Sequence, residues 1–157
     1  MTEQKAFQDL VPANASRRYC YGCGADNPRG LHIKSYWEGD EGVCRWKPQS
    51  FHSSGPPDSL NGGVAATLID CHSVYTAIAT AYRLEGREMG QGEPIDYATA
   101  KLTVTYLKRT PMDTALELRS KVAKKGNRSM VVETVLLADG EECVRGEVIA
   151  VRVSPKA

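Results

Sequence analysis

A single carboxylate, Asp70, lies in the middle of the most apolar stretch of the chain, residues 60–83. Burying an ionised carboxylate without a partner is energetically costly. No basic residue lies three or four positions from Asp70 in either direction, so a helix would offer it no local ion pair. Asp70 therefore either reaches solvent, accepts hydrogen bonds from backbone donors elsewhere, or performs acid–base or nucleophilic chemistry.

Two adjacent glycines, Gly62 and Gly63, open the same stretch directly after Asn61. Asparagine is a favoured N-cap, so the sequence predicts a helix from Gly62 to about Arg83. The amides of Gly62 and Gly63 would then lie unpaired in the first turn, at the positive end of the helix dipole. Such amides bind oxyanions, although two glycines could also serve only to let the helix pack tightly on a sheet.

The spacing between the glycines and the carboxylate limits how they could act together. Gly62 and Asp70 are eight residues apart, which is roughly 12 Å along one helix. An oxyanion donor and a general base both have to lie about 3 Å from the reacting group. If both residues are catalytic, the amide and the carboxylate must come from two subunits whose helices are antiparallel, so we expect a site across a dimer interface.

The neighbours of Asp70 do not complete a catalytic pair on their own helix. Two residues along a helix is a rotation of about 200°, so His72 points away from Asp70 and is expected to be a packed or interfacial histidine. No histidine is placed to activate Cys71, and a thiol in so apolar a helix is usually inert.

The segments before and after this helix predict the strands of an antiparallel sheet. "LHIKSYW" and "VCRWKP" are joined by a turn and predict a hairpin, and a loop rich in Gly, Pro and Ser leads to the helix. Four strands follow, of which the last three are joined by "GNR" and "DGE" turns. The helix is apolar on every side, so we expect an α+β fold in which the sheet wraps around it.

Length and composition are those of one domain. A chain of 157 residues is long enough for a substantial core. We expect residues 1–18 to be a mobile or loosely docked lead-in and residues 19–157 to form the domain. A net charge of +1 gives no overall field for nucleic acid or an anionic membrane. The N-terminus does not resemble a secretory signal and the five cysteines do not form a disulfide pattern, so we expect a cytoplasmic protein.

The segment "NGGVAATLID" is similar to a motif of a known family. It resembles the H-G-G-x-x-x-T-L-x-D core of hotdog-fold acyl-CoA thioesterases of the phenylacetate-pathway type. "CYGCGADNPRGL" is similar to their opening motif, "TAKLTVTYLKRTP" to their first strand after the helix, and the segment from "ALELRS" to "VIAVRV" to their closing strands. The resemblance spans most of the chain from Tyr19 onward and implies the hotdog fold, with one long central helix.

The resemblance also implies roles for individual residues. Asp70 would be the general base or nucleophile that acts on the thioester, with water as second substrate and no cofactor. The amide of Gly62 in the partner subunit would polarise the carbonyl, with Asn61 and Gly63 beside it. Thr99, seven residues before the strand tyrosine Tyr106, would assist the carboxylate or its water. The assembly would be a homodimer or a dimer of dimers.

Two departures from the family pattern affect substrate contacts. Asn61 replaces the histidine of the H-G-G motif, and Gly55 stands where some relatives have an Asn or Gln that holds the carbonyl. His52 or Ser54 are candidates to replace that contact. Coenzyme A carries several phosphate charges, and the basic residues expected to meet them are Lys108, Arg109, Lys124, Lys125 and Arg128.

The sequence also offers three alternatives to a hydrolase. Cys20 and Cys23 form one C-x-x-C, but a structural zinc site needs four ligands and only His32 is near in sequence, so we expect no metal. "DNPRGLH" lacks the spacing of the D-x-N-P-x-H motif of hotdog enoyl-CoA hydratases. The remaining alternative is a non-catalytic acyl-CoA-binding or sensing module, which would keep the pocket and basic residues without depending on Asp70.

Overall fold

The structure is a computed structural model that describes residues 3–155. Within this range, one long helix and six strands make up most of the fold, together with short 3-10 helices at Phe7–Leu10, Ser16–Tyr19 and Ser50–His52. The long elements are β1 (Ser35–Glu38), β2 (Glu41–Trp46), α1 (Gly62–Leu84), β3 (Asp96–Tyr106), β4 (Leu116–Lys125), β5 (Ser129–Ala138) and β6 (Glu141–Val153).

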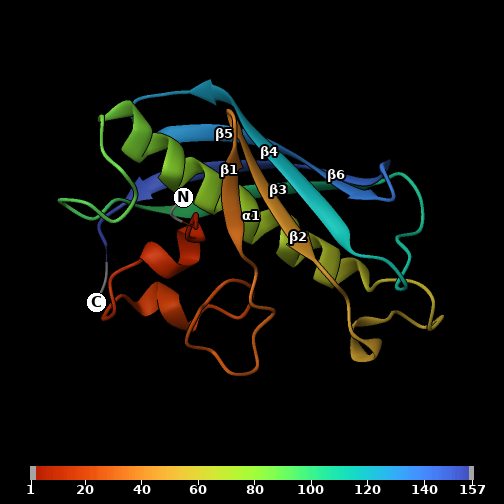
Figure 1. Ribbon diagram of the computed structural model, residues 1–157. Helices are drawn as coiled ribbons and strands as arrows, with labels where there is room; N and C mark the ends of the chain where they lie inside the picture. The colour runs from red at the N-terminus through yellow and green to blue at the C-terminus, as the bar shows by residue number, and fades with distance from the viewer. Residues whose placement is uncertain (1–2, 156–157) are drawn as a thin grey trace.

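The strands form one antiparallel sheet in the order β1-β2-β4-β5-β6-β3, and α1 crosses one face of it (Figure 1). Side chains from α1 and the inner face of the sheet form a continuous core. This is the α+β hotdog arrangement that the sequence predicts, so the expected fold is confirmed.

The helix begins and ends where the sequence signals are. The Asn61 side chain accepts hydrogen bonds from the amides of Gly63 and Val64, and Gly86 follows the C-cap with φ +68°. By length and hydropathy α1 could span a membrane, but 72% of its most apolar window is buried inside the fold. Its all-round apolar composition is therefore explained by the sheet and loops that enclose it, as predicted.

One feature of the sheet differs from a simple succession of hairpins. The β4-β5-β6 meander forms as the turn residues predict, but β3 does not pair with β4. Instead β3 crosses to the far edge of the sheet and pairs with β6 along its whole length. As a result an eleven-residue strand has one hydrogen-bonding edge without a partner strand among residues 3–155.

The N-terminal segment is packed, which corrects the expectation of a mobile or loosely docked lead-in. Phe7 is buried edge-to-face against Trp37, with ring centroids 5.3 Å apart. Gln8 is also buried, donates to the Ser35 hydroxyl (2.9 Å) and accepts from the Ser35 amide (2.8 Å). These contacts dock the segment on β1, although the boundary between residues 18 and 19 stays a prediction. Part of the proposed lead-in, residues 1–2, lies outside the described residues.

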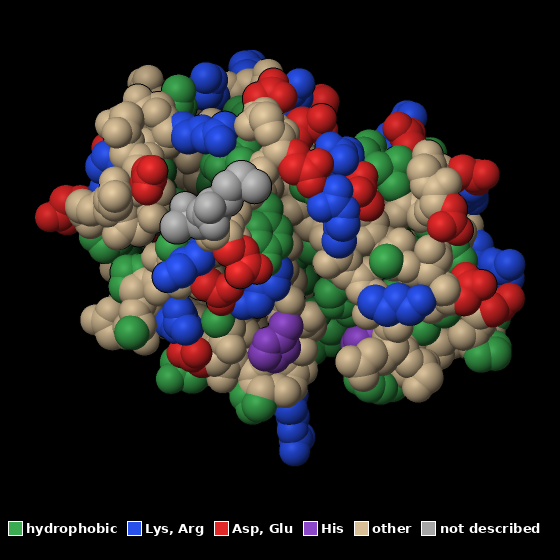
Figure 2. All heavy atoms as spheres, in the orientation of Figure 1, with side chains coloured by type: hydrophobic (Ala, Val, Ile, Leu, Met, Phe, Trp, Pro, Cys, Tyr) green, Lys and Arg blue, Asp and Glu red, His purple; other side chains and the backbone are tan. Residues whose placement is uncertain are grey.

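The outer surface carries charges of both signs. On the face shown in Figure 2, basic and acidic side chains are interspersed. On neighbouring strands, Arg45 pairs with Glu38 (2.8 Å) and Glu117 (3.1 Å), and Arg119 pairs with Glu117 (2.6 Å). Such exposed pairs contribute little to stability.

Candidate active site

Asp70 is partly buried and has one hydrogen-bond donor that comes from another element. The Thr99 hydroxyl on β3 donates to Asp70 Oδ1 at 2.5 Å. Burial raises the pKa of the Asp70 carboxyl, the Thr99 hydrogen bond opposes this, and the nearby Cys20 sulfur raises it further. A carboxylate that is partly desolvated, with its pKa raised by burial, is better suited to take up a proton than an exposed one. The structure thus brings together the two residues that the resemblance paired.

A β-bulge explains how Thr99 and Tyr106 both face α1. Residues seven apart on a regular strand point to opposite faces, because side chains alternate with period two. In β3 the pairing with β6 shifts between Thr99 and Lys101, which inserts one extra residue. Thr99 therefore reaches Asp70, while the Tyr106 hydroxyl donates to the carbonyl of Gly62 at 2.6 Å. Because of the bulge, β3 contacts α1 through hydrogen bonds at both Gly62 and Asp70.

The start of α1 offers one free amide rather than two. Asn61 Oδ1 accepts from the amides of Gly63 (2.8 Å) and Val64 (3.1 Å). Within the described residues the amide of Gly62 makes no hydrogen bond. The expectation that the Gly63 amide is also unpaired is wrong, since an N-cap side chain satisfies the second and third helical amides. Of the two glycine amides, only that of Gly62 is free to bind a ligand.

Two of the predicted basic residues lie beside Gly62. A cavity of about 190 Å³ at the N-terminus of α1 is lined by Ser59, Leu60, Gly62, Ala65, Tyr106, Lys108, Arg109 and Thr110. At its rim Lys108 is ion-paired with Glu141, and Arg109 with Asp58 at 2.9 Å. Both cations are solvent-exposed, so a phosphate group could compete for them.

The remaining basic residues lie at the opposite end of the molecule. Arg128 contacts the carbonyl of Arg152 (3.4 Å), and Arg152 pairs with Glu85 just after the C-terminus of α1. Lys124 and Lys125 end β4 at the same hairpin. A 23-residue helix is roughly 33 Å long. The expectation that all these residues act as one group is therefore wrong within one chain, and Arg128 is separated from Lys108 and Arg109.

His52 and Ser54 take part in the structure of the loop before α1. His52 is buried against Trp46 (4.9 Å between centroids), its Nδ1 accepts from the Gln49 amide, and burial lowers its pKa. Its carbonyl accepts from the Asn61 amide at 2.9 Å, which helps to fix the N-cap. The Ser54 hydroxyl donates to the Ser59 carbonyl (3.1 Å), and the space beside Gly55 is open. Substrate contacts by His52 and Ser54 stay predictions.

His72 is a packed histidine, as predicted from its position on α1. It is fully buried, and its Nε2 lies 2.9 Å from the Gly42 carbonyl, which can only accept. Nε2 therefore carries the proton and Nδ1 accepts from the Ser35 hydroxyl at 2.7 Å. Burial lowers the pKa of His72 to about 4. The imidazole is neutral and its hydrogen bonds are satisfied within the fold.

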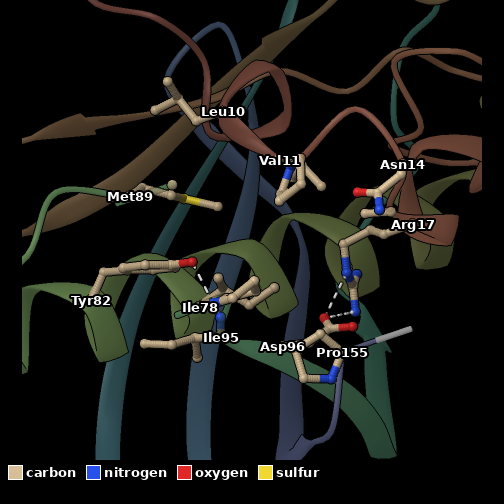
Figure 3. Close-up of a pocket in the computed structure, with 14 residues that line it drawn as sticks. Leu10, Val11, Asn14, Arg17, Ile78, Tyr82, Met89, Ile95, Asp96 and Pro155 are labelled. Atoms are coloured by element: carbon tan, nitrogen blue, oxygen red, sulfur yellow. Dashed lines mark hydrogen bonds and ion pairs between the residues drawn. The ribbon is translucent and has the colours of Figure 1, made fainter. Parts of the chain in front are cut away.

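A second cavity, of about 220 Å³, lies between the N-terminal segment, the C-terminal half of α1 and the loop before β3 (Figure 3). Leu10, Ile78, Tyr82 and Met89 contribute apolar walls, and the Arg17–Asp96 ion pair lies on one side. None of the predicted site residues lines it. We therefore do not assign this cavity to the chemistry of Asp70.

Sequence reasoning missed the surroundings of Cys71. The fold brings the thiols of Cys20, Cys23 and Cys71 within 4.8 Å of one another, and Cys71 directly follows Asp70 in the sequence. The spacing in the chain pointed only to His32 as a third ligand. The C-x-x-C motif was the available signal, but its third partner is 48 residues away and only the docking of the loop on α1 reveals it.

Comparison with known proteins agrees with this fold. The model of the thioesterase superfamily matches residues 58–144. A thioesterase superfamily protein from Shewanella loihica PV-4 is 36% identical, with a TM-score of 0.64, over 77% of this chain and 90% of that protein. No curated protein matches the chain significantly.

Two more distant solved structures share the fold. A hypothetical thioesterase with coenzyme A from Streptococcus pneumoniae TIGR4 is 16% identical over 80% of this chain and 88% of its own, with a TM-score of 0.62. The E. coli PaaI protein from the phenylacetic acid degradation operon is 15% identical over 80% and 83%, with a TM-score of 0.64. The match of the family model to more than half of the chain and the 36% identical structure together place this chain in the thioesterase superfamily.

Proposed function

We propose that the protein is an acyl-CoA thioesterase that hydrolyses its substrate to a free acid and coenzyme A. The observation that carries this proposal is the hydrogen bond from Thr99 to the partly buried Asp70, because it orients a carboxylate that has no ion-pair partner on its own helix. Membership of the superfamily supports the reaction class. A similar fold solved with coenzyme A supports the thioester carrier.

Asp70 acts in this proposal as general base or as nucleophile. As a base it takes a proton from water, which attacks the thioester carbonyl while Thr99 holds the carboxylate in place. As a nucleophile it attacks the carbonyl directly, and water then hydrolyses the acyl-enzyme anhydride. In both routes the oxyanion accepts a hydrogen bond from a free amide, and coenzyme A leaves as the thiolate.

The free amide is that of Gly62 in a partner subunit. Asp70 and Gly62 of one chain are roughly 12 Å apart along α1, too far to act on one carbonyl. Gly63, Ala66, Thr67 and Asp70 share the side of α1 that the sheet leaves partly exposed. The edge of β3 beside this face has no partner strand in the part of the chain that the structure describes, and it would pair readily with a second copy. A homodimer with antiparallel helices would bring Asp70 of one copy to Gly62 of the other.

Lys108 and Arg109 are the residues that we propose for the phosphates of coenzyme A. They lie next to the Gly62 amide around the same cavity, so a substrate whose carbonyl binds this amide would pass them. Their present partners, Glu141 and Asp58, are exposed carboxylates, and exposed pairs are weak enough to be exchanged for a phosphate. The five free cysteines fit a reducing compartment, so we propose the cytoplasm as the location.

The test is release of coenzyme A from a panel of acyl-CoAs, followed with a thiol reagent. Asp70→Asn keeps the size of the side chain and removes the base, so we expect kcat to fall by about 10²- to 10⁴-fold. Asp40→Asn, which neutralises an acid in the exposed β1–β2 turn, is the matched control and should retain activity.

The outcome also separates the enzyme from the alternative function. Tight binding of acyl-CoA by the wild-type protein with no release of coenzyme A would favour a non-catalytic binding or sensing module. Release that continues unchanged in Asp70→Asn would refute the proposed role of Asp70.

A further inference from the structure

The thiols of Cys20, Cys23 and Cys71 have the mutual spacing of metal ligands. Their sulfur atoms all lie within 4.8 Å of one another, and those of Cys20 and Cys71 are 3.8 Å apart. A Zn–S bond of about 2.3 Å in tetrahedral geometry places two ligand sulfurs about 3.8 Å apart. The three thiols therefore occupy one face of a tetrahedron of the right size, or need only small rotations to reach it.

The chain is built to hold these sulfurs together. A Cβ added to Gly22 would lie 2.4 Å from Cys71 Sγ, so only glycine lets the 20–24 loop approach α1 so closely. At Gly24 a Cβ would meet the backbone of Cys20 at 2.4 Å, while the Gly24 amide donates to the Cys20 carbonyl. The loop is further fixed by a hydrogen bond from the Ile33 amide to the Gly22 carbonyl. The sequence C-x-x-C-G is thus folded into a tight turn around Cys20.

The thiols are in mutual contact, and these contacts favour negative charge on the Cys20 sulfur alone. Donation from the thiols of Cys23 and Cys71 lowers the pKa of Cys20, and the backbone amides of Cys23 and Gly22 lower it further. The same arrangement, together with burial, raises the pKa of Cys71. A divalent cation bound by all three sulfurs would displace the two protons that the thiols of Cys23 and Cys71 share with the Cys20 sulfur. The positive charge of the Arg17 guanidinium acts to lower the pKa of Cys23, against the larger effects that raise it. The same charge would offset the net negative charge of three thiolates bound to one divalent cation.

We propose that Cys20, Cys23 and Cys71 bind one Zn²⁺ ion, with water as the fourth ligand. The ion would clamp the loop of residues 20–24 to the middle of α1, one residue from Asp70. This differs from the expectation of no metal, which rested on finding only His32 near Cys20 and Cys23 in the sequence, where zinc needs four ligands. The proposal concerns metal binding by this chain and does not depend on the proposed hydrolase activity.

The test is metal binding by the full chain, purified with a phosphine reductant and freed of metal. We expect one equivalent of Co²⁺ to give sulfur-to-cobalt charge-transfer absorption in the near ultraviolet and intense visible bands of a tetrahedral thiolate site. One equivalent of Zn²⁺ should remove both signals. In addition, Zn²⁺ should protect three cysteines from alkylation, identified by peptide mass spectrometry as Cys20, Cys23 and Cys71.

Variants distinguish this site from adventitious binding. We expect Cys71→Ser to lower Zn²⁺ affinity by at least about 100-fold. Cys143→Ser is the matched control, because Cys143 is buried outside the cluster and its thiol donates to the Glu141 carbonyl, to which a serine hydroxyl could also donate. If Cys71→Ser does not fold, Cys20→Ser replaces a less buried thiol of the same cluster. Reduced wild-type protein that binds no Co²⁺ or Zn²⁺, or equal affinity in Cys71→Ser and Cys143→Ser, would overturn the proposal.

Discussion

The two halves of α1 have similar apolar compositions but different surroundings. From Gly62 to Asp70 one side of the helix is partly exposed, the amide of Gly62 has no acceptor among the described residues, and the Asp70 carboxyl has one donor from β3. From Cys71 to Tyr82 nearly every side chain is buried. There the polar groups of His72 and Ser73 are paired with Ser35, Gly42 and Thr134.

This difference shows where chemistry remains available on the helix. Asp70 and His72 are two residues apart, yet burial raises the pKa of the first and lowers that of the second, because each environment disfavours the charged form. The hydrogen bonds of His72 are all used within the fold, whereas Asp70 and the Gly62 amide keep capacity for a ligand. The candidate site therefore lies in the half that the fold leaves incomplete.

In the half of α1 from Gly62 to Asp70, the largest effect expected after that of Asp70→Asn is loss of the proposed oxyanion donor, the Gly62 amide. Gly62→Pro removes the amide hydrogen, and proline is well tolerated at the first position of a helix. Asn61 already has φ −59° and ψ 130°, the extended conformation that a following proline requires. We expect kcat for acyl-CoA hydrolysis to fall by about 10²- to 10³-fold with little change in helix content by circular dichroism.

Gly62→Ala is the control for this substitution. Its Cβ would lie 3.3 Å from the Tyr106 hydroxyl, a tight but adjustable contact, and it keeps the amide hydrogen. If Gly62→Pro folds and hydrolyses acyl-CoA as fast as Gly62→Ala, the amide is not the donor, and the contrast between the two halves loses its catalytic meaning.

The buried half of α1, from Cys71 to Tyr82, should make the stability of the protein depend on pH through His72. The unfolded chain protonates a histidine near pH 6.5, but His72 in the folded protein has its pKa lowered to about 4. The unfolded chain therefore binds a proton that the folded protein does not bind between about pH 6.5 and pH 4. The free energy of unfolding is unaffected by His72 above about pH 6.5 and falls by about 3 kcal/mol in total as the pH is lowered toward 4. Urea unfolding at intervals between these pH values measures the loss.

His72→Gln is the comparison for the pH series. Glutamine can donate to the Gly42 carbonyl and does not titrate, so its free energy of unfolding should fall less steeply over the same range. Parallel pH curves for the two proteins would show that His72 is not a buried neutral group.

A smaller effect is expected from the hydroxyl that orients Asp70. Thr99→Val keeps the shape of the side chain and removes its hydrogen bond, and we expect kcat/KM to fall by about tenfold. Because the hydroxyl lowers the pKa of Asp70, its removal should also move the acidic limb of the kcat/KM profile to higher pH. Thr103→Val, on the same strand but facing away from Asp70, should change neither value. An unmoved acidic limb in Thr99→Val would contradict the orienting role.

The local elements of the fold could be predicted because their signals are local. Asn61 caps the helix that begins at Gly62, and the turn residues separate β4, β5 and β6 as expected. The position of His72 opposite Asp70 also follows from helix geometry alone. Thr99 was reached through the family resemblance, and the structure supplies its physical reason, since the bulge in β3 lets residues seven apart share one face.

The sequence by itself determined the buried helix, its capped start and the lone carboxylate within it, because periodicity, capping and composition act between near neighbours. Only the tertiary structure decided the placement of β3 beside β6, the separation of Arg128 from Lys108 and the meeting of Cys20 with Cys71. These depend on which surfaces pack together, and packing joins residues that no local pattern connects.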